Sequence, residues 1–382
     1  MLKFKKIVSF VLVAAMAATS MVACSKKESA DGAIKIGAIG PTTGGAAIYG
    51  NAVKYGAEIA IEEINAKGDI QFALNFQDDE HDAEKSVNAY NNLKDWGMQV
   101  LMGTVTTSPC LAVVEKTHED NMFQLTPSAS ATGVIKYDNV FQMCFTDPNQ
   151  GTKSADYIAE NKLATKVAVI YNSSDAYSSG IYNNFAKEAK EKGIEVVSAE
   201  AFTDDSKTDF SVQLNKSKAS GAELVFLPIY AQEASQILEQ ANSMGYQTTF
   251  FGCDGLDGIL AIEGFNKSLA EGVILLTPFV AGDTKSQANV DFTNKFKEKY
   301  KDTPNQFAAD AYDAIYVIAE CMKSGNVTAD MSASDICGIM KTEMTKVKYD
   351  GLTGESITFA ADGSVNKSPN AMKIQNGEYV AM

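Results

Sequence analysis

Serine and threonine residues gather at the ends of two apolar runs that are typical of buried strands. The run VLM leads into GTVTTSP (103–109), and the run MFQL leads into TPSASAT (126–132). Hydroxyl groups and backbone amides at helix N-termini bind a carboxylate without a full positive charge. The two loops are therefore candidates for binding an anion, although serine and threonine also serve simply as helix caps.

A second set of loops supplies tyrosines and one acid. Three later apolar runs, KVAVIY, LVFL and TFF, are followed by loops that reach Tyr177, Tyr230 and Asp254. A lone acid can pair with an ammonium group, and aromatic rings can enclose a side chain. If these loops face the hydroxyl-rich loops, the combination favours a zwitterionic α-amino acid as the ligand.

The elements that must position these loops alternate along the chain. Val53, Ala57, Ala60 and Ile64 have helical spacing, and Gly68 is placed to end that helix. Short strands that alternate with such helices predict βαβ units and parallel sheets, and the series begins again after DPN at 147–149. We expect an α/β fold with two doubly wound lobes, whose ligands lie beyond the carboxyl ends of the strands.

The first residues have the features of an export signal. Three lysines precede an apolar stretch of roughly a dozen residues, which suits a signal peptide and is short for a membrane span. The stretch ends in MVAC, which resembles a bacterial lipobox, except that Met21 stands where leucine is usual. We expect cleavage to leave Cys24 as a lipid-carrying N-terminus, with a plain secretory signal as the alternative. Later in the chain no stretch approaches 18 apolar residues, so the exported body is expected to be soluble.

The composition excludes several classes of protein. The net charge is −15, from 48 acidic and 33 basic side chains, which argues against binding to nucleic acid. Five cysteines remain after Cys24 and none has CxxC spacing, so we expect neither a disulfide scaffold nor a zinc site. The sequence leaves the redox state of these thiols open: Cys110, Cys144, Cys253, Cys321 and Cys337.

Enzymatic chemistry finds little support in the sequence. His81 and His118 are the two histidines, and both lie among acidic residues in stretches expected to be solvated. The GxSxG and GxxxxGK[ST] motifs are absent, and GAIGPTTGG lacks the spacing of a dinucleotide-binding loop. We expect no catalytic residues, no cofactor and no metal.

The chain resembles the leucine/isoleucine/valine-binding protein family of branched-chain amino acid ABC transporters. The similar segments follow one another in order: IKIGAIGPTTGGAAIYG, GTVTTSPCLAVV, LTPSASAT, VAVIYNSSDAYSSG, ELVFLPIYAQEASQILEQ, FFGCDGL and QFAADAYDAIYVIAEC. The resemblance implies the periplasmic binding protein type I fold, in which two lobes are joined by a three-crossing hinge. The crossings are expected near Asn149, near Thr277–Pro278 and between Gly354 and Phe359.

These crossings imply the domain limits. The expected parts are a signal peptide (1–23), a lipidated cysteine with its tether (24–32), lobe 1 (33–149 plus 278–356) and lobe 2 (150–277 plus 357–382). The last segment is expected to rejoin lobe 2 as a hairpin with its turn at Asn376–Gly377.

The resemblance also implies roles for single residues. Thr107 and Ser130 correspond to hydroxyl residues that bind the ligand carboxylate, and Ser128 contributes backbone groups. Tyr49 corresponds to an aromatic residue beside the ligand side chain, and Phe279 to an apolar wall.

In the second lobe, Tyr177 and Tyr230 correspond to tyrosines that close the cleft. Asp254 stands where the family usually has a glutamate that contacts the ammonium. The best-studied members carry a disulfide at the positions of His81 and Thr106, so that bridge is absent here.

The function that the resemblance implies is that of an extracytoplasmic, lipid-anchored substrate-binding protein of an ABC importer. It would act as a monomer, close its two lobes on an amino acid and deliver the ligand to membrane permease subunits. The ligand stays open between a branched-chain amino acid, another neutral amino acid and a small amide or urea-type solute. A ligand sensor with the same fold is a further alternative.

Overall fold

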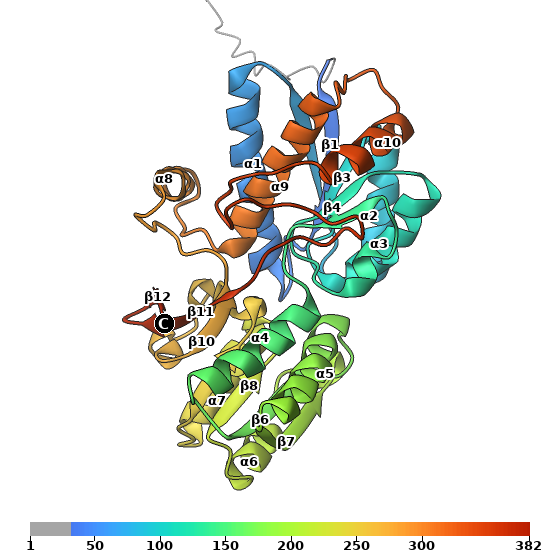
Figure 1. Cartoon of the computed structure of the whole chain (residues 1–382). Helices are drawn as coiled ribbons and strands as arrows, with labels where there is room; N and C mark the ends of the chain where they lie inside the picture. Colours follow the sequence, from blue (N-terminus) through green and yellow to red (C-terminus); the bar gives the residue numbers. More distant parts are fainter. Residues whose placement is uncertain (1–31) are drawn as a thin grey trace, which may run out of the picture. The chain divides into compact units, whose positions relative to one another are not determined.

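The computed structural model describes residues 32–382, which form one compact unit. Cys24, the expected signal peptide and nearly all of the tether lie outside the described residues. Within residues 32–382 the strands form a five-stranded sheet and a seven-stranded sheet, each flanked by helices, and thus two α/β lobes (Figure 1). The expected fold class is confirmed.

The first lobe is built on an all-parallel sheet with the order β2-β1-β3-β4-β5. Its strands are β1 (Ile34–Gly40), β2 (Phe72–Asp78), β3 (Val100–Gly103), β4 (Gln124–Thr126) and β5 (Val140–Gln142). Its helices are α1 (Ala47–Lys67), α2 (Ala83–Trp96), α3 (Thr107–Glu119), α8 (Gln287–Tyr300), α9 (Gln306–Ser324) and α10 (Ala333–Met344). Gly68 ends α1 with a φ of 84°, a conformation that glycine adopts without strain, as the sequence predicts.

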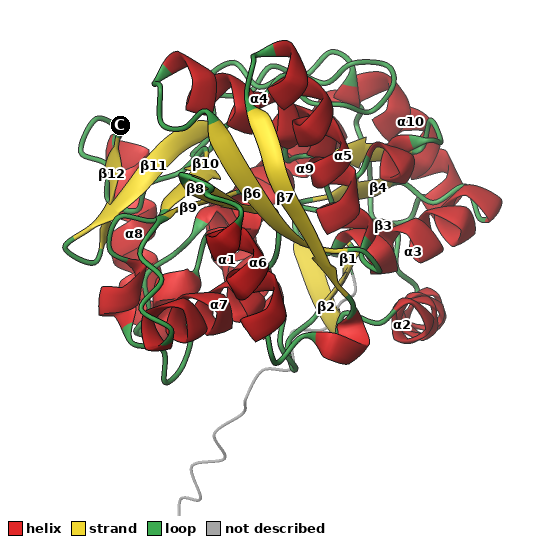
Figure 2. Cartoon of the chain, turned by 90° about the horizontal axis from the view of Figure 1, so that it is seen from below, coloured by secondary structure: helices red, strands yellow, loops and turns green. Residues whose placement is uncertain are grey.

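The second lobe has the sheet order β12-β11-β10-β9-β8-β6-β7. Its strands are β6 (Lys166–Asn172), β7 (Glu195–Phe202), β8 (Leu224–Leu227), β9 (Thr249–Gly252), β10 (Ile274–Thr277), β11 (Asn370–Gln375) and β12 (Glu378–Ala381). Its helices are α4 (Asp147–Glu160), α5 (Ala176–Glu191), α6 (Ser211–Ala219) and α7 (Ala231–Ser243). In Figure 2, β6 and β7 run between α4 and α5 on one side and α6 and α7 on the other.

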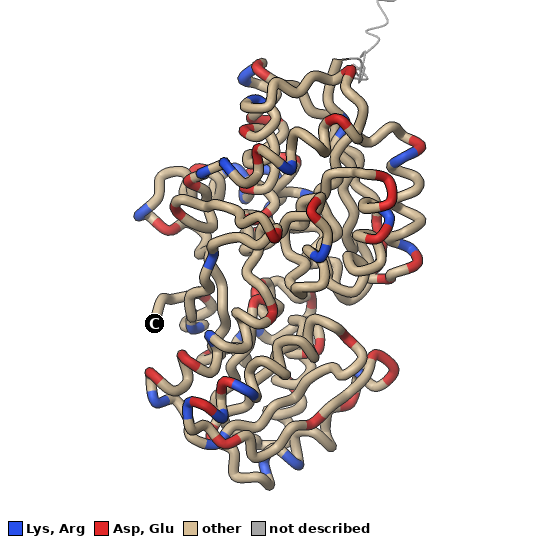
Figure 3. Tube along the Cα trace, turned by 45° about the vertical axis from the view of Figure 1, so that its right-hand side comes forward, with Lys and Arg blue, Asp and Glu red and all other residues tan. Residues whose placement is uncertain are grey.

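Short 3₁₀ helices complete the chain, and they are η1 (Thr132–Ile135), η2 (Asp204–Ser206), η3 (Asp254–Leu256), η4 (Ile259–Ala261) and η5 (Lys267–Ala270). Figure 3 shows basic and acidic residues interspersed along both lobes. Ion pairs such as that of Lys192 with Asp156 (2.6 Å) join neighbouring helices at the surface. Exposed pairs of this kind contribute little to stability.

The chain passes between the sheets at three places. The first crossing leads from β5 into α4, and the second leaves β10 for α8 and α9, which return to the first lobe beside α1. The C-terminal hairpin of β11 and β12 joins the second sheet antiparallel to β10, with its turn at 376–377.

The third crossing lies later than the sequence indicates. Gly363 O accepts a hydrogen bond from Gln142 N (3.0 Å), and the Phe359 ring lies 6.1 Å from that of Phe141. Residues 357–365 therefore pack on β5 of the first lobe, although we expected them in the second. Local pairing of Phe359 with Val365 folds the segment back on itself, and the crossing falls between Asn366 and Asn370.

A buried ion pair stands beside this crossing. Lys367 Nζ lies 2.6 Å from Asp310 Oδ1 and also bonds Thr353 Oγ1, and the two charged side chains are only 2% and 3% exposed. Asn149 Nδ2 donates to Lys367 O (3.3 Å), so the first and third crossings lie side by side. Burial raises the pKa of Asp310 to about 6, and the Lys367 ammonium opposes that rise. The buried ion pair thus fixes the third crossing to α9 of the first lobe, and the Asn149 amide joins that crossing to the first one.

Candidate ligand-binding site

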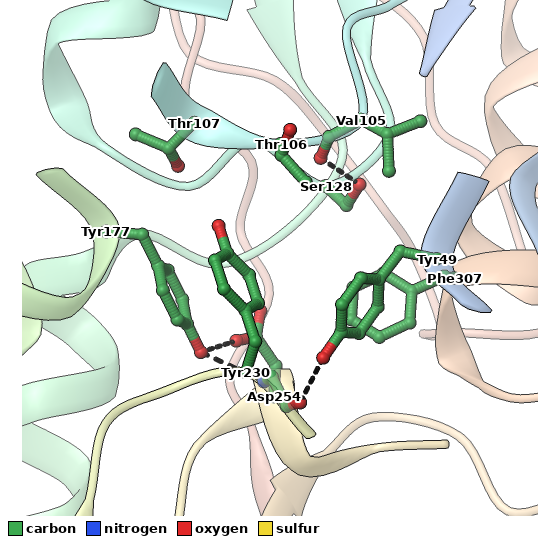
Figure 4. Close-up of a pocket in the computed structure, with 10 residues that line it drawn as sticks. Tyr49, Val105, Thr106, Thr107, Ser128, Tyr177, Tyr230, Asp254 and Phe307 are labelled. Carbon is green, nitrogen blue, oxygen red and sulfur yellow. Dashed lines mark hydrogen bonds between the residues drawn. The ribbon is translucent and has the colours of Figure 1, made fainter. Parts of the chain in front are cut away.

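A small pocket lies between the loops that follow the strands of the two lobes. Its cavity volume is about 10 Å³, roughly the room of one water molecule, so the loops are nearly in contact. Figure 4 shows the side chains that converge on it. The lining residues are Tyr49, Val105, Thr106, Thr107, Ser128, Tyr177, Tyr230, Asp254, Gly255 and Phe307.

The first lobe lines one side of the pocket with the hydroxyl residues Thr106, Thr107 and Ser128, which we call the roof. Ser128 Oγ donates to Val105 O (2.6 Å), and Thr126 Oγ1 donates to Thr104 O (2.7 Å). These bonds tie the loop after β4 to the loop after β3. Thr107 begins α3, so the positive end of that helix dipole faces the pocket, where an anion is favoured.

The second lobe contributes an acid held by a tyrosine. Tyr177 Oη donates to Asp254 Oδ1 (2.6 Å) and accepts from Gly255 N (2.9 Å). Burial raises the pKa of Asp254 to about 7, and the Tyr177 hydroxyl opposes that rise. A side chain at Gly255 would place its Cβ 2.6 Å from Tyr177 Oη, so this close approach requires glycine.

Tyrosine rings form the rest of the second-lobe wall. The rings of Tyr177 and Tyr230 are stacked with centroids 4.8 Å apart, and the Tyr230 hydroxyl points toward the roof (Figure 4). Tyr230 is half-buried, and its desolvation in the pocket raises its pKa well above the usual value. The wall therefore presents ring faces together with the Tyr230 hydroxyl group, which is directed toward the first lobe.

Tyr49 links the two lobes directly. Its hydroxyl donates to Gly255 O (2.6 Å) and accepts from Ala231 N (2.8 Å), both in the second lobe, while its helix α1 belongs to the first. The ring packs edge-on against Phe307 (4.7 Å) and lies 5.4 Å from Tyr230. We call these two hydrogen bonds the Tyr49 clasp. The sequence predicted an aromatic wall at Tyr49 but gave no sign of the clasp.

The mouth of the pocket holds a second contact between the lobes. Ser108 Oγ donates to Asp175 Oδ1 (3.2 Å), and the His81 ring meets Tyr230 edge-on at 5.4 Å. His81 was expected to be solvated, but it is half-buried, and burial lowers its pKa. His81 Nδ1 lies 2.9 Å from Thr106 Oγ1, so a hydrogen bond joins the two positions where the resemblance implied a lost disulfide.

Two of the eight expected ligand residues lie outside the pocket lining. Phe279 belongs to the core, where its ring lies 6.1 Å from Phe292. Ser130 lies behind the roof, with its N–H donating to Thr107 Oγ1 (3.2 Å). The other six line the pocket together, and their part in ligand binding stays a prediction: Tyr49, Thr107, Ser128, Tyr177, Tyr230 and Asp254.

Four lining residues were missed in the sequence. Val105 and Thr106 lie within the hydroxyl-rich loop, and Gly255 directly follows Asp254, so their positions beside expected residues were a usable signal. Phe307 had no such signal, because it stands in the first turn of α9 and reaches the pocket only through the return of the chain to the first lobe.

Comparisons with known proteins identify the family. The model of the family described as "Periplasmic binding protein" matches residues 33–378. Leu/Ile/Val-binding protein homolog 3 of Brucella melitensis is 31% identical, over 91% of this chain and 93% of its own length.

Two solved structures share the fold. The branched-chain amino acid transporter substrate-binding protein LivJ from Streptococcus pneumoniae, in complex with isoleucine, has a TM-score of 0.83 and 27% identity, over 91% of this chain and 98% of its own. An ABC transporter solute-binding protein from R. palustris, in complex with benzoate, has a TM-score of 0.81 and 21% identity, over 92% of this chain and 96% of its own. With a family match over nearly all of its described residues, the chain belongs to the periplasmic binding protein family.

Proposed function

We propose that this chain is the extracytoplasmic substrate-binding protein of an ABC importer and that it captures a neutral α-amino acid between its lobes. The observation that carries the proposal is the pairing of a hydroxyl roof at the N-terminus of α3 with the buried Asp254. The roof suits a carboxylate and the acid suits an ammonium. The names of the Brucella and Streptococcus relatives support the same ligand class.

The charges favour an amino acid over a simple carboxylate. No lysine is among the residues that line the pocket within 32–382, and Asp254 is 3% exposed. A ligand such as benzoate would bring a second negative charge toward this buried acid, and like charges in a site of low dielectric repel strongly. An ammonium group reverses the sign of that interaction. Val105 and Phe307 add apolar lining, which a short side chain would contact once the lobes part enough to admit the ligand.

Closure explains how binding is coupled to capture. A ligand that contacts both the roof and Asp254 does so only when the lobes are together, so it shifts the equilibrium toward the closed form. The Tyr49 clasp and the bond from Ser108 to Asp175 join the lobes in the closed, ligand-free arrangement described above. The clasp residue also covers the ligand, because its ring is part of the pocket lining.

The membrane attachment belongs to the same proposal. Among residues 32–382 every helix is too short or too polar to cross a bilayer. Lipid on Cys24 would hold the protein beside its permease. Cys24→Ser should release the protein from the membrane fraction into the medium or periplasm. Equal membrane retention of Cys24→Ser and wild type would refute the anchor.

A thermal-shift screen tests the ligand class. The screen uses the twenty standard L-amino acids, small amides, urea and benzoate, and a ligand at 100 times its dissociation constant stabilises by about 2.7 kcal/mol. We expect a neutral amino acid to give the largest shift. Asp254→Asn should abolish most of it, whereas Asp204→Asn, outside the pocket, should leave it unchanged. A thermal shift with benzoate alone, or with an amide alone, would contradict the proposal. An amide would bind the protonated form of the Asp254 carboxyl, which is available near neutral pH because the pKa of Asp254 is about 7.

A further inference from the structure

Two buried glutamines hold the main chain on both sides of the Asp254 side chain. Gln150 lies in the first turn of α4 and Gln306 is the first residue of α9, and both are buried. Gln150 Oε1 accepts from Asp254 N (3.1 Å), and Gln306 Nε2 donates to Asp254 O (3.1 Å). Both backbone groups of the acid thus end on the side-chain amides of residues far away in the sequence.

The two glutamines come from different lobes. Gln150 follows the first crossing and belongs to the second lobe, whereas Gln306 lies in the first lobe, which the chain re-enters after the second crossing. Gln306 N also donates to Asp257 Oδ2 (2.9 Å), directly after η3. The segment that carries Asp254 is therefore fixed both to α4 of its own lobe and to α9 of the other.

This arrangement leaves one carboxylate oxygen for a ligand. The Tyr177 hydroxyl donates to Asp254 Oδ1, and the glutamines fix the main chain from which the carboxyl projects. Asp254 Oδ2 is then the oxygen that can accept from an ammonium group in the pocket. Because a hydrogen bond weakens steeply with a poor angle or distance, the fixed main chain matters for the strength of that contact.

Gln150 also acts on the charge of the acid. Burial raises the pKa of Asp254 to about 7, and the Tyr177 hydroxyl and the Gln150 amide oppose that rise. Gln150 Nε2 is buried without an acceptor at hydrogen-bonding distance within residues 32–382, so we attribute its effect to the N–H dipole beside the carboxyl. An ammonium group pairs with the ionised acid, which is the form that this dipole favours.

Other titratable groups surround the same carboxyl. Buried phenols and thiols, whose pKa values burial raises, stay neutral between pH 5 and 8, which leaves two other acids that can contribute to a pH dependence. The groups that interact electrostatically with Asp254 are Tyr49, Cys144, Asp147, Tyr177, Tyr230, Cys253 and Asp310.

We propose that Gln150 and Gln306 are positioning residues for ligand binding, which hold Asp254 in place for the ligand's ammonium group, and that Gln150 also favours the charged form of this acid. This inference rests on the proposed function. Neither glutamine is part of the pocket lining, so both act through Asp254 rather than by touching the ligand.

The test measures apparent affinity by thermal-shift titration with an equimolar mixture of the twenty standard L-amino acids between pH 5 and 8. It compares the wild type with Gln150→Met, Gln306→Met and the control Gln99→Met. Gln99 is also buried, but its Oε1 accepts from Lys35 N (3.0 Å) within the first lobe, away from the pocket. Wild-type affinity should fall as the pH is lowered through the pKa of Asp254, and Asp254→Asn should bind weakly without that step.

The two glutamine variants should differ from each other. Gln150→Met removes the dipole, so the midpoint of the affinity profile should move up by about one pH unit, with about tenfold weaker binding below it. Gln306→Met leaves that dipole in place, so binding should weaken about threefold to tenfold at every pH with the midpoint unchanged. Gln99→Met should lower the melting temperature and change neither quantity, as should any glutamine whose role is only structural.

The outcomes separate this inference from the proposed function. If the wild type binds the mixture while both variants keep its affinity and its pH profile, the inference is wrong and the proposed function stands. If Gln150→Met does not fold, Gln306→Met decides, and wild-type affinity in that variant would overturn the inference. If the wild type itself gives no shift with the mixture, both are wrong.

Discussion

Replacing Tyr49 by phenylalanine isolates the clasp from the wall of the pocket. The change keeps the ring that packs on Phe307 and removes only the hydroxyl that bonds Gly255 O and Ala231 N. In the open form water satisfies these two backbone groups. The lost bonds therefore count only against closure, and the stability of each separate lobe should change little.

The magnitude follows from the two bonds. An intramolecular hydrogen bond contributes about 0.5–1.5 kcal/mol net, so closure loses about 1–3 kcal/mol. That free energy corresponds to a change of about 5- to 150-fold in an equilibrium constant. Because the ligand contacts both lobes only in the closed form, a less favourable closure should weaken the ligand affinity by a similar factor.

Two measurements on the full chain check this. Calorimetric titration gives the affinity, and small-angle scattering gives the radius of gyration with and without ligand. Tyr90→Phe is the matched control, since Tyr90 is also buried but its hydroxyl bonds Asp120 within the first lobe (2.8 Å). If Tyr49→Phe and Tyr90→Phe both bind like the wild type and show the same compaction with ligand, the two bonds do not govern closure.

Three further changes test other parts of the structure. Lys367→Met leaves Asp310 buried without its cation and should cost about 3–5 kcal/mol in denaturant unfolding, much of it recovered by adding Asp310→Asn; an unchanged midpoint would contradict this. Thr107→Val removes the hydroxyl that accepts from Ser130 N and should weaken amino acid binding by about 1–3 kcal/mol in calorimetry, so full affinity would remove Thr107 from the roof. Burial raises the pKa of Asp254 from 3.8 to about 7, so between these pH values the folded ligand-free protein holds a proton that the unfolded chain has released. The melting temperature of the wild type, relative to that of Asp254→Asn, should therefore fall as the pH rises from 5 to 7.5. A wild-type melting temperature that rises relative to that of Asp254→Asn over this range would refute the prediction.

The sequence predicted what depends on local pattern. The alternation of strands and helices, the end of α1 at Gly68 and the loops that meet at the pocket all follow from periodicity and from the geometry of parallel sheets. Six of the eight expected site residues line one cavity for that reason.

What the sequence missed depends on the direction of side chains in the folded molecule. Ser128 and Ser130 are two residues apart, yet only Ser128 lines the pocket, because the loop after β4 is not a regular strand and its side chains do not alternate predictably. Phe279 follows β10 as expected but turns into the core. The burial of the Asp147 carboxyl and the reach of Tyr49 across the lobes become visible only when burial and distances are known.

Two opposing free-energy contributions act on the closure of the ligand-free protein. The Tyr49 clasp favours closing by about 1–3 kcal/mol. Burial of Asp254 in the interlobe pocket disfavours it while this carboxyl is ionised, since a buried charge without a counter-charge costs several kcal/mol. Asp254 therefore opposes closure until a cationic group arrives, and the clasp then helps to keep the lobes together.

A proton should act on this balance as a partial substitute for the ligand. Asp254 has a pKa of about 7 in the closed form, and burial also raises the pKa values of Asp147 and Asp175. Lowering the pH from 8 to 5 neutralises Asp254 and removes part of the cost of closing, although protonation of the half-buried His81, whose pKa is lowered by burial, acts in the opposite direction. The ligand-free protein should thus be more compact in small-angle scattering at pH 5 than at pH 8, and Asp147→Asn with Asp254→Asn should reduce the dependence. A radius of gyration that is the same at both pH values would mean that these carboxyl groups do not oppose closure.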